Sequence, residues 1–103
     1  MMLPRDIEER LRDLLAHFPV VAVIGARQVG KTTLGRRVLA DAPIFTFDPT
    51  QDLGGARQDP DLFLQNHASP CFLDEVQYVP ELLSALKREV DRDPRKGRFL
   101  LSG

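Results

Sequence analysis

Residues 20–33 of the chain read VVAVIGARQVGKTT, and this stretch decides the fold. An apolar run leads into a glycine, and the spacing G-x-x-x-x-G-K-[ST] is filled by Gly25, Gly30, Lys31 and Thr32. Glycines let a backbone wrap closely around a phosphate, where a Cβ would collide. An apolar strand, a glycine-containing loop and a helical pattern in this order predict a nucleotide-binding site rather than an ordinary turn between a strand and a helix.

The loop and the start of its helix supply the groups that we expect to act on the nucleotide. Backbone N–H groups in such a loop converge on phosphate oxygens, and the helix that follows adds the positive end of its dipole. Lys31 is predicted to reach the β- and γ-phosphates as a catalytic residue, and the Thr32 hydroxyl to hold Mg²⁺. The predicted nucleotide-binding residues of this segment are Gly25, Gln28, Val29, Gly30, Lys31, Thr32 and Thr33.

A second motif, CFLDE at residues 71–75, supplies two neighbouring carboxylates. Asp74 follows an apolar run, and an aspartate at the carboxyl end of such a strand is the typical Walker B residue that controls the metal. The adjacent Glu75 is predicted to polarise the attacking water as the catalytic base. Together with the phosphate loop, the pair predicts ATP as the substrate, Mg²⁺ as the cofactor and hydrolysis as the reaction.

Strands are expected to alternate with helices along the whole chain. The apolar pattern predicts helices over 4–16 and 31–40, a short one capped by Asp59 and another from Pro80, with strands over 20–25, 44–47, 71–73 and 98–102. Such an alternation is typical of an α/β fold with a parallel sheet.

Several packing details follow from the same patterns. The segment 20–25 lacks polar alternation, which predicts a strand covered on both faces. In the last helix, the inward-facing residues are predicted to be Leu82, Leu83, Leu86 and Val90. Basic and acidic residues interleave over 87–98, which favours a solvated face over a DNA-contact patch. Gln77, just beyond Glu75, is a candidate to hold water, but a solvated residue that precedes the helix is the favoured interpretation.

Composition narrows the classes of protein and partner. With 103 residues, the chain has room for at most one domain. Lysine plus arginine (14) nearly balances aspartate plus glutamate (15), so the net charge does not favour a nucleic-acid partner. A single cysteine, Cys71, excludes an internal disulfide. Because no apolar run approaches membrane-spanning length and the start lacks a signal-peptide profile, we expect no membrane partner and a cytoplasmic location.

The segments GARQVGKTTL, FLDEVQYVPELLSALK and RFLLSG together resemble the AAA-type P-loop ATPases of bacteria and archaea. In particular, they are similar to the group with an N-terminal ATPase domain and a C-terminal domain of unknown function. The likeness covers nearly all of the chain but only the first part of such a protein. Residues 1–103 are therefore expected to be the N-terminal part of one P-loop ATPase domain, truncated before the end of its sheet.

The resemblance implies a three-layer P-loop NTPase fold with a mainly parallel sheet of about four strands. The fourth strand would lie between the phosphate-loop strand and the Walker B strand, and the family's fifth strand would be missing. Ser102 would then end a central strand beside the γ-phosphate, at the polar sensor position. Relatives with an arginine finger in trans work as assemblies, so the resemblance allows a homo-oligomer of the full-length form.

Other functions compete with the ATPase hypothesis. A non-hydrolysing interaction module that uses nucleotide as a switch, or an inactive fragment, agrees with the missing carboxyl-terminal part. A GTPase is less favoured, because its Asp-x-x-Gly element would need glycine where the chain has Gln77. A small-molecule kinase is also less favoured, since no acceptor-binding lid is evident. What hydrolysis would drive stays open.

Overall fold

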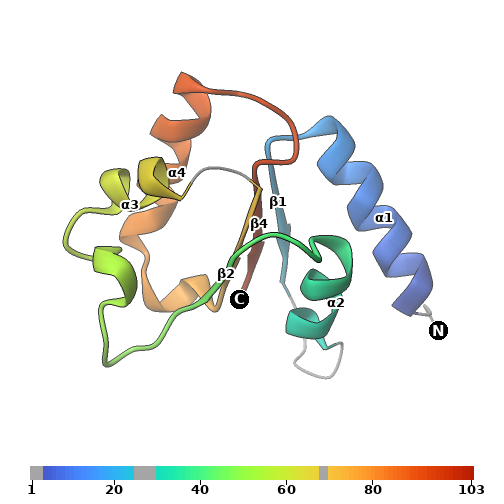
Figure 1. Cartoon of the computed structure of the whole chain (residues 1–103), viewed down its shortest axis with the longest axis horizontal. Coiled ribbons are helices and arrows are strands. Elements are labelled where there is room, and N and C mark those ends of the chain that lie inside the picture. Colours follow the sequence, from blue (N-terminus) through green and yellow to red (C-terminus); the bar gives the residue numbers. More distant parts are fainter. Residues whose placement is uncertain (1–3, 25–29, 68–69) are drawn as a thin grey trace.

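Helices and strands alternate along the chain, as the sequence predicts. The structure is a computed structural model that describes residues 4–24, 30–67 and 70–103 (Figure 1). The elements are α1 (Pro4–His17), β1 (Val20–Val23), α2 (Lys31–Val38), β2 (Ile44–Thr46), η2 (Leu53–Gly55), α3 (Pro60–Asn66), β3 (Cys71–Asp74), η3 (Val76–Tyr78), α4 (Glu81–Arg92) and β4 (Phe99–Ser102).

The four described strands form one sheet in the order β1-β4-β3-β2, and every neighbouring pair is parallel. The last strand in sequence therefore lies between β1 and β3, which confirms the order implied by the resemblance. Phe99 of β4 pairs with Val20 on one side and with Cys71 on the other. Because all the strands run the same way, their carboxyl ends meet at one edge of the sheet.

Helices cover the sheet on both faces, which confirms the three-layer α/β fold. α1 and α2 lie on one side, and α3 and α4 on the other (Figure 1). Alternate residues of the central strands enter the two cores: Phe72 and Leu100 pack with α1 and α2, whereas Leu73 and Phe99 pack with α3 and α4. The central strands are buried throughout, as expected where both faces are covered.

α1 packs as an amphipathic cover for the sheet. Its Leu11 and Leu15 are buried together with Val21 of β1 and Leu34 of α2. On the outer side, Glu8 of α1 forms an ion pair with Arg37 of α2 at 3.0 Å. α1 therefore packs against β1 and α2, on the same face of the sheet as α2.

α2 approaches β3 closely because Gly35 has no side chain. A Cβ added at Gly35 would lie 2.2 Å from Cε2 of Phe72, well inside van der Waals contact. α2 itself is shorter than predicted. It ends at Val38 instead of residue 40, because Leu39 leaves the helical conformation.

Two predictions about packing are wrong. β1 is not covered on both faces: it is the edge strand of the described sheet, Ala22 is exposed, and Ile24 just beyond it is 81% exposed. In α4, Leu83 does not face inward but is 49% exposed, whereas Leu82 and Leu86 are buried. No described element covers Ala22 of β1, and Leu83 of α4, which lines the same pocket as Ala22, is therefore also exposed.

The charged segment at the end of α4 is not wholly solvated, contrary to prediction. Glu89 and Arg98 are 4% and 2% exposed, and their side chains form an ion pair at 2.9 Å. Arg98 also donates to the backbone oxygens of Glu89 and Asp93, at the carboxyl end of the helix. Periodicity over α4 aligns Glu89 with Leu82, Ala85 and Leu86, the other buried residues of the helix.

The predicted cap of α3 is confirmed. The carboxylate of Asp59 accepts a hydrogen bond from the backbone N–H of Leu62 at 3.1 Å, and Pro60 opens the helix. Across the described residues, no helix combines the length and apolar character that a membrane crossing needs.

Candidate functional site

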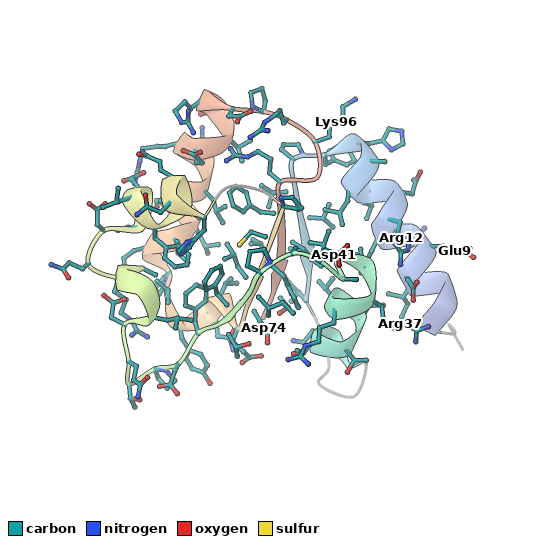
Figure 2. All side chains as sticks on the ribbon, viewed as in Figure 1. Glu9, Arg12, Arg37, Asp41, Asp74 and Lys96 are labelled. Carbon is teal, nitrogen blue, oxygen red and sulfur yellow. The ribbon has the colours of Figure 1, made fainter. Side chains whose placement is uncertain are left out.

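The residues predicted to act on a nucleotide gather where β3 and β4 end and α2 begins. Figure 2 shows Asp74 at the lower end of the sheet, while Lys96, which precedes β4, lies at the upper end. The lower edge therefore carries the carboxyl ends of the strands. In open parallel sheets, this is the edge at which ligands bind.

The carboxylate of Asp74 is the centre of this cluster. It is 2% exposed and accepts hydrogen bonds from three hydroxyl groups on three other elements. Thr32 at the start of α2 and Thr46 at the end of β2 donate to Oδ2, at 2.9 and 3.0 Å. Ser102 at the end of β4 donates to Oδ1. These bonds fix the orientation of the acidic side chain.

The start of α2 holds four of the predicted nucleotide-binding residues, Gly30, Lys31, Thr32 and Thr33. Gly30 caps the helix with a left-handed backbone (φ 64°, ψ 52°), a conformation that glycine adopts without strain. The ammonium group of Lys31 donates to the carbonyl oxygen of Gly103 at 2.7 Å, one residue beyond Ser102. Thr33 is exposed in the same turn. Gly25, Gln28 and Val29 lie outside the described residues.

Glu75 stands directly after β3 with an unusual backbone. Its φ of 61° and ψ of 44° place it in the left-handed region, which costs roughly 1–2 kcal/mol for a residue with a Cβ. Its half-buried carboxylate accepts a hydrogen bond from Nε2 of Gln77 at 2.8 Å. Strain of this kind is often found at functional sites.

The structure therefore brings together Lys31, Thr32, Asp74 and Ser102, with Glu75 next to Asp74 in the chain. One neighbour, Thr46, is not among the predicted site residues. Thr46 pairs with Asp74 across the parallel sheet, and a polar residue ending a short apolar strand was its only signal. Gln77 is exposed in η3 ahead of α4, as predicted, but its contact with Glu75 is not predicted, because the backbone turn that directs its amide there has no sequence pattern of its own.

The donor groups of the cluster suit a magnesium ion. Mg²⁺ prefers oxygen ligands and binds through one or two carboxylates together with substrate phosphates and water. A hydroxyl oxygen of Thr32 and a carboxylate oxygen of Asp74, 2.9 Å apart, supply this chemistry. Within the described ranges, no group of three or more histidine, cysteine or acidic side chains is arranged around a common metal position.

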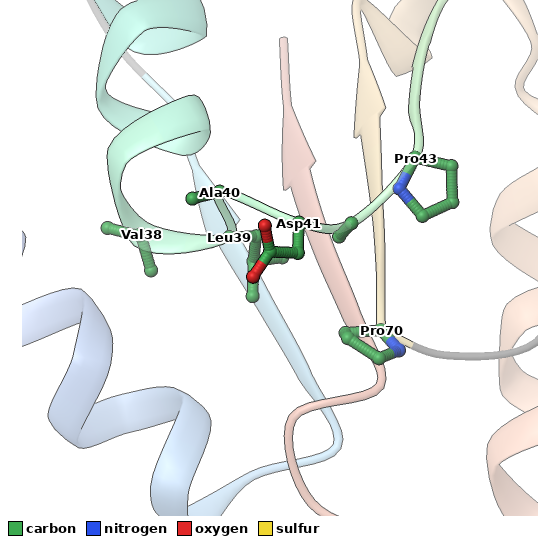
Figure 3. A pocket seen from close by; sticks show the side chains of 7 residues that line it. Val38, Leu39, Ala40, Asp41, Pro43 and Pro70 are labelled. Carbon is green, nitrogen blue, oxygen red and sulfur yellow. The ribbon is translucent and has the colours of Figure 1, made fainter.

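A pocket at the other end of the sheet has a different character. It measures about 470 Å³ and lies between the end of α2 and the residues that precede β2 and β3, among them Pro43 and Pro70 (Figure 3). The carboxylate of Asp41 is in its lining, which disfavours a phosphate. The strand ends around Asp74 are the better nucleotide site.

Comparison with known proteins agrees with this geometry. The family model described as "AAA domain" matches residues 17–103. The uncharacterized proteins Mb2031c of Mycobacterium bovis and Rv2008c of Mycobacterium tuberculosis are each 42% identical over 100 residues, which is 96% of this chain. The chain spans 23% of the length of these two curated relatives. No solved structure matches. The chain therefore belongs to the AAA domain family of ATPase-type nucleotide-binding domains.

Proposed function

We propose that this chain binds ATP with Mg²⁺ at the carboxyl ends of β3 and β4 and takes part in hydrolysis of the terminal phosphate. The observation that supports it best is the hydrogen bond from Thr32 to Asp74, which unites the two motifs at one point. A hydroxyl at the start of the loop helix and an acid at the end of a neighbouring strand are the pair that this chemistry requires.

Lys31 binds the phosphate end of the nucleotide. Its ammonium group contacts the carbonyl oxygen of Gly103 at 2.7 Å, so the side chain already extends toward the end of β4. A triphosphate at the start of α2 offers charged oxygen acceptors to the same ammonium group. The positive end of the α2 dipole favours the same position for the anion.

Thr32 and Asp74 are the residues that would hold the metal, and Mg²⁺ when bound neutralises charge that develops on the phosphate oxygens. Thr46 and Ser102 keep the Asp74 carboxylate in place through their hydroxyl groups. Because Asp74 is almost fully buried, an unsupported carboxylate there would be costly.

Glu75 receives the proton of the attacking water. As the water oxygen bonds to the γ-phosphorus, the bond from that phosphorus to the bridging oxygen breaks, and ADP leaves with the bonding electrons. A carboxylate within hydrogen-bond reach of the water lowers the barrier by taking up this proton. The Glu75 carboxylate accepts a hydrogen bond from the side-chain amide of Gln77 at 2.8 Å.

Three forms of the protein test the proposal. We expect Lys31→Ala to weaken ATP binding and Glu75→Gln to retain binding while losing turnover, measured by phosphate release and by ATP titration. Lys87→Ala is the matched control, since this exposed lysine on α4 pairs only weakly with Asp91 at 3.4 Å. Equal phosphate release from wild type, Lys31→Ala and Glu75→Gln would contradict hydrolysis at this site.

A nucleotide-binding module without hydrolysis is the second candidate. It predicts stabilisation by Mg·ATP of about 2.7 kcal/mol at a concentration 100 times Kd, without phosphate release. Competition between ATP and GTP for a labelled nucleotide would identify the preferred base.

A further inference from the structure

We infer that Gln77 is a positioning residue for Glu75: its side-chain amide holds the Glu75 carboxylate in the orientation that receives a proton from water. The inference rests on the proposed function. It goes beyond that function because Gln77 belongs to neither the phosphate loop nor the pair of acids at residues 74 and 75.

The contact that carries the inference is a short, directed one. Nε2 of Gln77 donates to Oε2 of Glu75 at 2.8 Å. A hydrogen bond to an ionised carboxylate is about twice as strong as one between neutral groups. A carboxylate has about four acceptor positions, so this bond leaves capacity for a water molecule on the same group.

The backbone around Glu75 makes this contact available. Residues two apart do not face each other on a helix, so the contact depends on Glu75 lying outside the helical conformation. Its left-handed backbone supplies that condition, and the turn then continues as η3, with the N–H of Tyr78 donating to the oxygen of Glu75 at 3.3 Å. The left-handed backbone at Glu75 is therefore the conformation that allows its carboxylate to contact Gln77.

The other end of the Gln77 side chain lies against the end of β4. A Cβ added at Gly103 would lie 2.7 Å from Oε1 of Gln77, so the amide is next to the same glycine whose carbonyl Lys31 contacts. Gln77 thus stands between Glu75 and the strand end near the lysine that we expect to bind phosphate. A neutral amide there can orient the carboxylate without adding a charge near the phosphates.

The consequence is a specific kinetic effect. Removing a supporting partner of an active-site group typically lowers activity by about 10- to 100-fold, because the group spends less time in the reactive orientation. The side chain of Gln77 contacts Glu75 and lies next to Gly103. Its loss should therefore change kcat and leave nucleotide affinity unchanged.

The test compares Gln77→Met with Gln65→Met in the whole chain. Methionine keeps the approximate length of glutamine and removes the donor, and Gln65 is an exposed glutamine on α3 that serves as the matched control. We expect Gln77→Met to lower kcat about tenfold, with KM, the ATP Kd and Tm unchanged. Gln77→Glu, which puts a carboxylate beside Glu75, should be at least as slow. Gln65→Met should behave as wild type.

A double-mutant cycle separates positioning from a general structural role. If Gln77 acts through the Glu75 carboxylate, Gln77→Met should cause no further loss in the residual rate of phosphate release that a Glu75→Gln variant retains, measured in a single turnover at high enzyme concentration. The full tenfold loss in that background would overturn the inference, as would a Gln77→Met rate equal to or above wild type, or a loss that comes with weaker ATP binding. An active wild type with an equally active Gln77→Met refutes this inference alone. A wild type that binds ATP but releases no phosphate refutes the proposed hydrolysis and the inference with it.

Discussion

The hydroxyl of Thr32 donates a hydrogen bond to the carboxylate of Asp74 at 2.9 Å, and this bond joins the first turn of α2 to the end of β3. The two residues are 42 positions apart in the chain. Asp74 also accepts from Thr46 on the outer strand β2, and the two threonines share the same carboxylate oxygen. Thr32 and Thr46 therefore make similar hydrogen bonds to Asp74, but only Thr32 is a proposed ligand of Mg²⁺, so the two residues can be compared directly.

Replacing each threonine by valine should separate metal binding from support. Thr32→Val removes a proposed Mg²⁺ ligand, so we expect the ATP affinity to lose most of its dependence on Mg²⁺. Thr46→Val removes a hydrogen bond alone, so it should lower the free energy of unfolding by about 0.5–1.5 kcal/mol and keep the Mg²⁺ dependence. ATP titrations with Mg²⁺ and with EDTA measure the difference. An equal loss of Mg²⁺ dependence in both variants would contradict the assigned roles.

The left-handed backbone of Glu75 predicts that glycine at this position is more stable than alanine, although both variants lose the carboxylate. Glu75→Gly and Glu75→Ala should both lose hydrolysis, because neither retains a carboxylate. Glycine adopts a φ of 61° without a Cβ clash, so Glu75→Gly should be the more stable of the two by about 1 kcal/mol, reduced by its greater entropy when unfolded. Urea unfolding of the two variants measures this. A more stable alanine variant would show that the backbone at residue 75 is not strained.

Gly35→Ala tests the close packing of α2 on β3. Alanine is intrinsically a better helix former by about 1 kcal/mol, but its Cβ would overlap the Phe72 ring. We expect a net loss of about 1–3 kcal/mol in the free energy of unfolding, since overpacking usually outweighs propensity. In a Phe72→Leu background the loss due to Gly35→Ala should shrink. An unchanged loss there would place the strain elsewhere.

The buried ion pair of Glu89 and Arg98 predicts how stability depends on pH. Hydrogen bonding from Arg92 lowers the pKa of Glu89 from its ordinary value of 4.5, burial opposes this, and Arg98 adds to the lowering. The native state therefore holds fewer protons than the unfolded state at acid pH. This contribution to stability is present above the ordinary pKa and is lost as the pH falls through the lowered one.

Glu89→Gln should reduce the free energy of unfolding by about 3–5 kcal/mol at neutral pH, because it leaves Arg98 buried beside a neutral partner. The same variant should show a smaller further loss on acidification than wild type. Urea unfolding between neutral and acid pH measures both effects, and Glu81→Gln, at an exposed position on the same helix, is the matched control. An identical acid dependence in wild type and Glu89→Gln would contradict the link to this residue.

The sequence alone was enough for the order of elements and for the two motifs. Short apolar runs and amphipathic helices are local patterns, so their periodicity predicts each described strand and long helix to within a few residues. The same patterns, read with the resemblance to AAA-type ATPases, gave the position of β4 between β1 and β3. The cap at Asp59 was also local, and it was predicted for that reason.

Tertiary structure decided what depends on neighbours distant in the chain. Leu83 and Leu82 are both apolar residues of α4, so the sequence predicts both to be buried. Leu83 is exposed because no described element covers it and the neighbouring face of β1. Glu89 and Arg98 read as surface charges, yet the turn between α4 and β4 buries them together. The hydroxyl of Thr46 and the amide of Gln77 reach the acids only through the pairing of β2 with β3 and through the backbone at Glu75. The periodicity of apolar residues indicates which face of a helix or strand is buried. A site instead depends on which elements lie next to each other, and this is decided only when the strands pair into the sheet.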